Sequence, residues 1–252
     1  MKLNHSNSKV GIIMPMYNAE ATIERAIESV INQKYKEWIL YIIDDCSTDN
    51  SHVLIEKYLS DDRIVLLKND CNIGAAKTRN NGLIASNEEF ICFLDSDDEW
   101  LPEKLFIQKN EIGTNDFFSI TNYNYISQGN SFPIIANKLF LNKHDLLSKK
   151  YRVCFSSLMI KRKDKEMVFE NIGHEDFLFL LGCLKENRVI KIVNKPLVNY
   201  HAQPVSLSSN KKKAIIWHYK ILKNLYPFNL IKRCYYMLCY AYQGVMFSKK
   251  IR

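Results

Sequence analysis

The sequence predicts an α/β protein with a mostly parallel, Rossmann-like central sheet flanked by helices and followed by a helical tail. Short apolar runs alternate with stretches of helical periodicity through the first hundred residues. Two of these runs, residues 38–43 and 90–94, lead directly into clusters of carboxylates. The composition is 47% hydrophobic and 25% charged over 252 residues, which is typical of a folded globular chain and excludes a disordered one.

The first half of the chain reads as three strand–helix repeats that lead into a central strand. Pro15 ends the first apolar run, and Asn18 is a suitable cap for the helix that follows. The expected strands are residues 10–15, 38–43, 63–68 and 90–94, and the expected helices are residues 23–31, 53–59 and a third that begins in 72–80. Regular alternation of this kind predicts parallel strands with helices on both faces.

The second half is less regular. Strands are expected at residues 116–126 and 153–162, a helix at 175–185, a polar and basic linker at 206–213, and tyrosine-rich helices at 214–226 and 230–247. We therefore expect a catalytic domain over residues 1–210, with halves at 1–100 and 101–210, and a basic helical tail over 211–252.

Charge is distributed unevenly along the chain. No Asp or Glu follows Glu186, whereas 13 Lys and Arg do, so the total of +8 leaves −5 for residues 1–186. This asymmetry predicts contact with an anionic polymer or membrane through one end. The seven cysteines form no C-x-x-C pair and predict reduced core residues, not a zinc cluster. The first residues lack the apolar core of a signal peptide, so we expect a cytoplasmic catalytic part.

The central apolar run ends at three carboxylates, Asp95, Asp97 and Asp98. Open α/β sheets bind ligands at the carboxyl ends of their strands, where these acids are expected to lie. Oxygen ligands favour Mn²⁺ or Mg²⁺, and such ions commonly share a site with substrate phosphates. On this stretch alone, an acidic turn before a helix starting at Pro102 explains the pattern equally well.

A second acid pair, Asp44 and Asp45, ends the preceding apolar run. Carboxylates at two strand ends suit a nucleotide, because one set accepts from a base or ribose while the other holds the cation on a diphosphate. Lys77 and Arg79, on the intervening helix, are placed to balance the charge. The sequence after Asp45 is also a common helix-capping pattern, so order and spacing must discriminate.

Four motifs occur in order, at residues 15–18, 44–49, 72–74 with 79–80, and 95–98. In this order they resemble the nucleotide-sugar-binding half of family 2 glycosyltransferases, which have the GT-A fold. The resemblance implies that Tyr17, Glu20 and Asp45 contact the nucleoside, that Asp95 lies against the ribose and donor sugar, and that Asp97 ligates the metal. The full donor-binding set that it implies is Pro15, Tyr17, Asn18, Glu20, Asp44, Asp45, Asn72, Gly74, Lys77, Arg79, Asp95 and Ser96. Cys46 stands where the family usually has glycine, which restricts the backbone beside the base.

The acceptor half resembles the family at residues 156–162 and 174–177. By that resemblance Asp176 is the general base that takes the proton from the acceptor hydroxyl, and a single displacement inverts the anomeric centre. The family's usual Gly-Gly-Phe-Asp lead-in is replaced by residues 167–173. From the residues alone, Glu175 and Asp176 are equally explained as first-turn acids favoured by the helix dipole.

Three further residues are candidates near the diphosphate or acceptor. His201 falls where relatives carry a basic residue that reaches a phosphate or the metal, although a histidine after a strand is often only a surface residue. Trp100 closely follows the metal motif and is expected to line the sugar pocket, and Glu175 precedes the predicted base. Trp38 and Trp217 are expected to be packing residues.

The resemblance implies transfer from a nucleotide-diphosphate donor, UDP-hexose being common among such relatives, to a saccharide linked to polyprenyl diphosphate. The implied setting is bacterial surface-polysaccharide biosynthesis (O-antigen, capsule or lipopolysaccharide), with no nucleic-acid partner. The uncharged stretch 234–248 is too short and too rich in tyrosine to span a bilayer. We expect it to lie on the cytoplasmic leaflet through Met237, Leu238, Val245 and Phe247, or instead to pack on the body or form a homodimer interface.

Other classes fit less well. A phosphatase with Asp95 as nucleophile needs Thr or Val where Glu99 stands, and an EF-hand needs Gly and Glu where Trp100 and Phe106 stand. A sugar nucleotidyltransferase needs a glycine-rich N-terminal loop, which residues 12–18 lack. A catalytically inactive relative that binds lipid-linked glycan or a partner remains an alternative.

Overall fold

The computed structural model describes residues 8–113, 117–162, 168–170, 173–184, 188–203 and 211–251. These residues form one sheet of ten strands with the order β3-β2-β1-β4-β9-β6-β10-β5, with β7 paired to β6 and β8 to β10. The strands are β1 (Val10–Met16), β2 (Trp38–Asp44), β3 (Ile64–Lys68), β4 (Phe90–Phe93), β5 (Glu99–Trp100), β6 (Phe118–Ser127), β7 (Asn130–Ile134), β8 (Phe140–Leu141), β9 (Met159–Lys161) and β10 (Ile190–His201). The helices are α1 (Ile23–Ile31), α2 (Ser51–Glu56), α3 (Ala75–Ala85), α4 (Lys104–Glu111), α5 (Lys143–Leu147), the short 3₁₀ helix η1 (Phe155–Ser157), α6 (Glu175–Cys183), α7 (Lys211–Leu225) and α8 (Leu230–Lys250).

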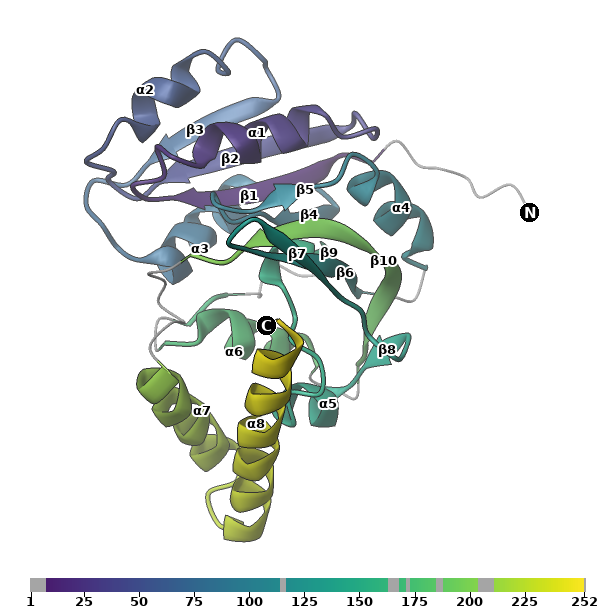
Figure 1. The fold of residues 1–252 in the computed structure, drawn as a ribbon. Helices are drawn as coiled ribbons and strands as arrows, with labels where there is room; N and C mark the ends of the chain where they lie inside the picture. The colour runs from purple at the N-terminus through teal and green to yellow at the C-terminus, as the bar shows by residue number, and fades with distance from the viewer. Residues whose placement is uncertain are drawn as a thin grey trace.

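The predicted parallel sheet is confirmed in the first half. Strands β3, β2, β1 and β4 are neighbours and run parallel, with Met16 opposite Asp44 in register. Helices α1 and α2 cover one face and α3 the other (Figure 1), as right-handed crossovers require. Helix α3 packs closely against β1 because Gly82 has no side chain, and a Cβ at Gly82 would lie 2.6 Å from the Ile13 side chain. The carboxyl ends of β2 and β4 therefore flank that of β1 at one edge of the sheet.

The second half departs from the parallel pattern. Strand β9 runs antiparallel to both β4 and β6, and β5 runs antiparallel to β10. The strand expected at residues 153–162 is reduced to β9, because η1 precedes it and the Ser157 hydroxyl donates to the Cys154 carbonyl at 2.6 Å. Asp116, Lys185 and residues 206–210 of the expected linker lie outside the described residues, and the remaining linker residues, 211–213, begin α7.

An aromatic cluster joins the two halves. The Phe93 ring, at the end of β4, lies 5.0 Å from Phe155 of η1 and 5.6 Å from Phe179 of α6. Phe169 stacks on Phe179 at 4.1 Å. Each of these rings is buried, so the acid loop that follows β4 and helix α6 are fixed to one core.

Helices α7 and α8 form a hairpin at the end of the molecule opposite α2 (Figure 1). One face of the hairpin packs on the body, because the His218 ring lies between Phe177 at 5.5 Å and Tyr240 at 4.6 Å. Met237 and Phe247 also pack against the core, so the expectation that these two side chains face a membrane is wrong. Leu238 and Val245 remain exposed. No helix among the described residues has the length and apolar character needed to cross a bilayer.

Candidate active site

Side chains of the loop after β1 hold the loop after β2. The Asn18 Oδ1 accepts from the Thr48 backbone N–H at 2.8 Å, and the Glu20 Oε2 accepts from the Asn50 backbone N–H at 3.0 Å. Tyr17, in the same loop, is 48% exposed. Two predicted donor-binding residues, Asn18 and Glu20, therefore shape the rim, while the Tyr17 ring remains free to contact a ligand.

Asp45 is fully engaged within the protein. Its Oδ1 accepts from the Ile73 backbone N–H at 2.9 Å and from Asn69 Nδ2 at 2.8 Å, and its Oδ2 accepts from the Gly74 backbone N–H at 2.9 Å. Gly74 has a φ of +85°, a conformation that favours glycine. The carboxylate thus fixes the turn that begins α3, and its predicted contact with a nucleoside stays a prediction.

The other predicted residues near this turn differ in exposure. Asp44 is buried, and its Oδ1 accepts from the Ser47 backbone N–H at 2.9 Å. Asn72 and Lys77 are exposed, and Pro15 is half-buried within β1. Pro15 and Asp44 therefore lie at the carboxyl ends of β1 and β2, Asn72 lies in the loop after β3, and Lys77 lies in the first turn of α3.

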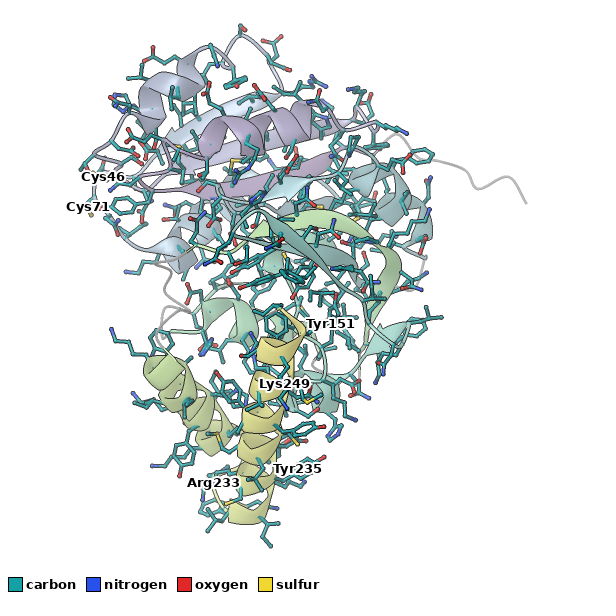
Figure 2. All side chains as sticks on the ribbon, viewed as in Figure 1. Cys46, Cys71, Tyr151, Arg233, Tyr235 and Lys249 are labelled. Carbon is teal, nitrogen blue, oxygen red and sulfur yellow. The ribbon has the colours of Figure 1, made fainter. Side chains whose placement is uncertain are left out.

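Cys46 occupies a left-handed backbone position, with a φ of +63°. Its side chain is exposed, and Figure 2 labels it at the surface of the molecule. A residue other than glycine costs roughly 1–2 kcal/mol in this conformation. The departure from glycine therefore strains the backbone beside the expected base pocket without blocking the fold.

The acids after β4 crowd one another. Asp98 is buried and accepts from the Ser156 hydroxyl at 2.5 Å and from the His201 backbone N–H at 3.1 Å. Burial, followed by the charges of Asp95 and Asp97, holds the pKa of Asp98 well above its usual range. Burial and the charge of Asp95 likewise raise the pKa of Asp97 to about 6. Ser96, between them, is half-buried.

The side chains around Asp97 that could ligate a metal ion suit a hard cation that also binds the substrate. A cation would offset the burial and the neighbouring Asp95 charge that together raise the pKa of Asp97. The His201 Nε2 is buried without a hydrogen-bond partner and lies 3.6 Å from the Glu99 Oε2, and burial lowers the pKa of this imidazole, which favours its neutral, ligating form. The described residues contain no ready-made group of three metal-binding side chains, so the remaining ligands would come from phosphate and water, as is usual for Mg²⁺.

Arg79 connects the acid loop to the predicted base. Its guanidinium is buried, with Nη2 at 2.6 Å from the Asp95 Oδ1 and Nη1 at 2.9 Å from the Asp176 Oδ1. The rings of Phe155 and Phe169 lie 5.1 and 5.6 Å from it. This bridge brings Asp176 of the acceptor half to the donor-side carboxylates, over 97 residues of sequence.

Asp176 lies in the first turn of α6, and its side chain is 42% exposed. The pKa of this carboxyl is raised to about 6 as the net result of several effects: burial raises it most, the Arg79 charge lowers it, and the Asp95 and Glu175 charges raise it. A carboxyl with this pKa is largely ionised at pH 7 yet basic enough to take a proton. The guanidinium of Arg79 pairs with Asp176 and not with Glu175, so the bridge distinguishes Asp176 from its neighbour.

The turn before α6 is held by the hairpin. Gly173 has a φ of +81°, and a Cβ there would lie 2.7 Å from the Trp217 ring. The His174 Nε2 lies 3.3 Å from the Ala214 carbonyl. Residues 167, 171 and 172 of the segment expected in place of the usual lead-in lie outside the described residues. Trp217 is a packing residue as expected.

Trp100 is not placed as expected. It is 2% exposed, its Nε1 donates to the Ser156 carbonyl at 2.8 Å, and the Lys104 Nζ lies 3.7 Å above its ring. The expectation that it lines the sugar pocket is wrong, because its indole N–H finds a backbone partner inside the core. Trp38 is buried as predicted.

Three residues near the site were given no role from the sequence. Ser156 joins Asp98 to the Asp95 backbone N–H, and Arg25 donates to the Asp97 carbonyl at 2.6 Å. Asn69 contributes to the bonds of Asp45. Asp98, the third carboxylate of the motif, indicated that a buried hydrogen-bond partner such as Ser156 would be needed. No local sequence pattern predicts the contacts of Arg25 and Asn69.

Comparison with known proteins gives concordant matches. The model of the family "Glycosyl transferase family 2" matches residues 11–169. An uncharacterized glycosyltransferase of Haemophilus influenzae is 34% identical over 96% of this chain and 98% of its own length. The Escherichia coli UDP-Glc:alpha-D-GlcNAc-diphosphoundecaprenol beta-1,3-glucosyltransferase WfgD is 34% identical, over 94% of this chain and 93% of its own length.

Two solved structures share the fold. TarS of S. aureus, in complex with UDP-GlcNAc, has a TM-score of 0.68 at 20% identity and covers 86% of this chain, which spans 67% of the TarS chain. The mannosyltransferase PcManGT of Pyrobaculum calidifontis, in complex with GDP-Man and Mn²⁺, has a TM-score of 0.67 at 14% identity, over 94% of this chain and 70% of its own. At sequence identities of 20% and 14%, these two structures show a shared fold alone.

Proposed function

The chain belongs to glycosyl transferase family 2 and has the GT-A fold, and from this premise we propose that it is an inverting transferase that moves a hexose from UDP to a lipid-linked saccharide. The observation that carries the proposal is the bridge from Asp95 through Arg79 to Asp176. The bridge holds a carboxylate of the acceptor half beside the acid loop of the donor half. A donor and an acceptor bound on either side would meet there.

The donor end is proposed for the loops at the carboxyl ends of β1, β2 and β4. Tyr17 is exposed and available to cover a base, and Glu20 and Asp45 fix the loops that would surround it. Asp97, with His201, would hold Mn²⁺ or Mg²⁺ against the diphosphate. When bound, this cation supplies charge that stabilises the leaving nucleoside diphosphate.

The proposed base is Asp176. In the ionised form its carboxylate accepts the proton of the acceptor hydroxyl as that oxygen attacks the anomeric carbon, and Arg79 holds the carboxylate in place. A single displacement of this kind inverts the anomeric centre. An α-linked nucleotide sugar would therefore give a β-linked product.

The acceptor is proposed to be a saccharide on polyprenyl diphosphate. WfgD and a second Escherichia coli relative, WfaP, which is 32% identical, are both named for transfer to a sugar on diphosphoundecaprenol. A substrate anchored in a bilayer suits a chain whose basic residues gather in residues 211–252. We accordingly assign catalysis to residues 1–210 and peripheral association with the inner membrane face, in bacterial surface-polysaccharide synthesis, to the tail.

The test is a panel of nucleotide sugars, incubated with the full chain, Mn²⁺ and a synthetic acceptor carrying GlcNAc on a lipid diphosphate, with released nucleoside diphosphate as the readout. We expect release from one UDP-hexose and a β-linkage by NMR. Release from no donor would favour an inactive, binding relative. An α-linked product from an α-linked donor would exclude single displacement.

A further inference from the structure

Helix α8 has an apolar face that points away from the body. We define the outward stripe as Ile231, Leu238, Tyr242 and Val245, which are 83%, 72%, 62% and 57% exposed. Their spacing of seven, four and three residues places them on one side of a helix. A helix on a soluble domain normally turns its polar face to water, so the outward stripe needs a partner.

The opposite face of α8 is already occupied. Tyr236 is buried, Tyr240 stacks on His218 at 4.6 Å, and the Phe247 ring lies 5.4 Å from Tyr125. The helix is thus fixed to the body through one side. The exposure of the outward stripe follows from this docking and is not the fraying of a loose terminus.

The surroundings of the outward stripe are basic. Lys232 directly follows Ile231, and Lys249 lies about one helical turn after Val245. The exposed lysines of the hairpin are Lys220, Lys223, Lys232, Lys249 and Lys250. No Asp or Glu follows Glu186 in the sequence, so no acid of the hairpin offsets them. Apolar side chains and a tyrosine, with lysines at both ends of the stripe, suit a bilayer surface with anionic headgroups. A second copy of the chain is a poorer fit, because lysine is depleted at protein interfaces and the two basic faces would repel.

The outward stripe runs along most of α8. From Ile231 to Val245 the helix rises about 21 Å at 1.5 Å per residue, so contact through the whole stripe requires the hairpin to lie flat. Figure 1 shows α8 running from the far end of the molecule back to the body, and Figure 2 shows Tyr235 and Lys249 toward its two ends. Insertion of the hairpin end alone would use Phe228, which is fully exposed, and would leave Val245 in water.

We propose that the outward stripe of α8 lies flat on an anionic lipid surface and thereby holds the acceptor half of the chain at the membrane. Near the C-terminal end of α8, Phe247 contacts Tyr125, which stacks on Tyr200 at 5.6 Å. Tyr200 directly precedes His201, the candidate diphosphate residue. A flat hairpin therefore sets the site close to the headgroups, where a lipid-linked diphosphate is found. The inference rests on the proposed function for the identity of that acceptor.

The experiment is co-sedimentation of the full chain with vesicles of phosphatidylcholine containing phosphatidylglycerol. The test variant is Leu238→Glu with Tyr242→Glu. Its matched control is Val53→Glu with Ile84→Glu, which adds the same charge at side chains 52% and 80% exposed on α2 and α3. We expect the test variant to lose at least tenfold in apparent affinity and the control to lose little. Phe228→Ser should have a smaller effect than the test variant.

Several results would overturn the proposal. The first is binding of the test variant that equals binding of the wild type, and the second is wild-type binding to phosphatidylcholine vesicles that equals its binding to vesicles with phosphatidylglycerol. The others are a larger loss of affinity for Phe228→Ser than for the test variant, and a wild-type dimer that the test variant converts to a monomer. Thermal unfolding of both variants checks that they fold. Nucleotide release with a water-soluble acceptor is measured in parallel: release without vesicle binding would overturn this inference alone, and vesicle binding without release would overturn the proposed function alone.

Discussion

The carboxylates after β2 and those after β4 lie at the same edge of the sheet but in opposite electrostatic settings. Asp45 accepts hydrogen bonds from two backbone N–H groups and one side-chain amide, which offset its charge. Burial, followed by the charges of neighbouring carboxylates, raises the pKa values of Asp97 and Asp98. The first set is complete within the protein and shapes a loop. In the second set Asp95 pairs with Arg79, and Asp98 accepts from the Ser156 hydroxyl and the His201 backbone N–H. Asp97 is the carboxylate whose charge a bound cation would offset, as expected of a metal ligand before the substrate binds.

The largest expected effect comes from Asp97→Ala. We expect turnover to be abolished, together with metal-dependent donor binding, because the cation would lose its carboxylate ligand while the diphosphate charge still needs an offset. Nucleotide release and calorimetric binding of donor, each with Mn²⁺ and with chelator, measure this. Full activity of the wild type in chelator would contradict the distinction between the two sets of carboxylates, because the acids after β4 would then not bind a required cation.

Asp176→Asn should follow, with a loss in kcat of about 10²–10⁴ and little change in donor affinity, because the amide cannot take a proton. Glu175→Gln is the matched control, one residue away on the same helix turn, and should retain most activity. Steady-state kinetics with donor titration separate the two effects. An equal loss in the control would assign the base to Glu175.

A smaller effect is expected in the pH dependence. The pKa of Asp176 is about 6, so kcat/KM should fall as the pH falls through 6 and the base becomes protonated. The Arg79 charge lowers this pKa, so Arg79→Gln should move the acid limb to higher pH. Arg79→Lys keeps the charge and should move it less, although it cannot bridge both carboxylates. An unmoved limb in Arg79→Gln would show that the bridge does not tune the base.

The smallest effect on chemistry and the clearest effect on folding should come from Asp45→Asn. An amide in place of this carboxylate leaves one of its three N–H donors facing another donor, and we expect a loss of about 1–3 kcal/mol in the free energy of unfolding. Asp97→Asn should cost nothing in the metal-free protein, because it removes a repelling charge. Urea denaturation of both variants in chelator provides the measurement. Equal destabilisation by the two would contradict the distinction between the clusters.

The sequence predicted the nucleotide half well because its signals are local. Apolar runs gave the strands, and the acids that follow them mark the strand ends. The simultaneous pairing of Arg79 with two carboxylates could not be predicted, because Asp95 and Asp176 lie 16 and 97 residues away from it. Trp100 misled for the same reason: its nearness to the acid motif suggested a pocket, but a backbone carbonyl across the core binds its indole. The shortening of the strand at residues 153–162 likewise depends on serine hydroxyls that find distant or backbone partners.

The contact between Gly173 and Trp217 has a consequence for how such chains diverge. The indole fills the space that a side chain at residue 173 would need, and residue 173 opens the turn that presents Asp176. Any larger residue at this position would have to be accompanied by a smaller one at 217. Among relatives, these two positions should therefore change together, and a tail exchanged between two relatives should carry its own partner for the turn or leave the base misplaced.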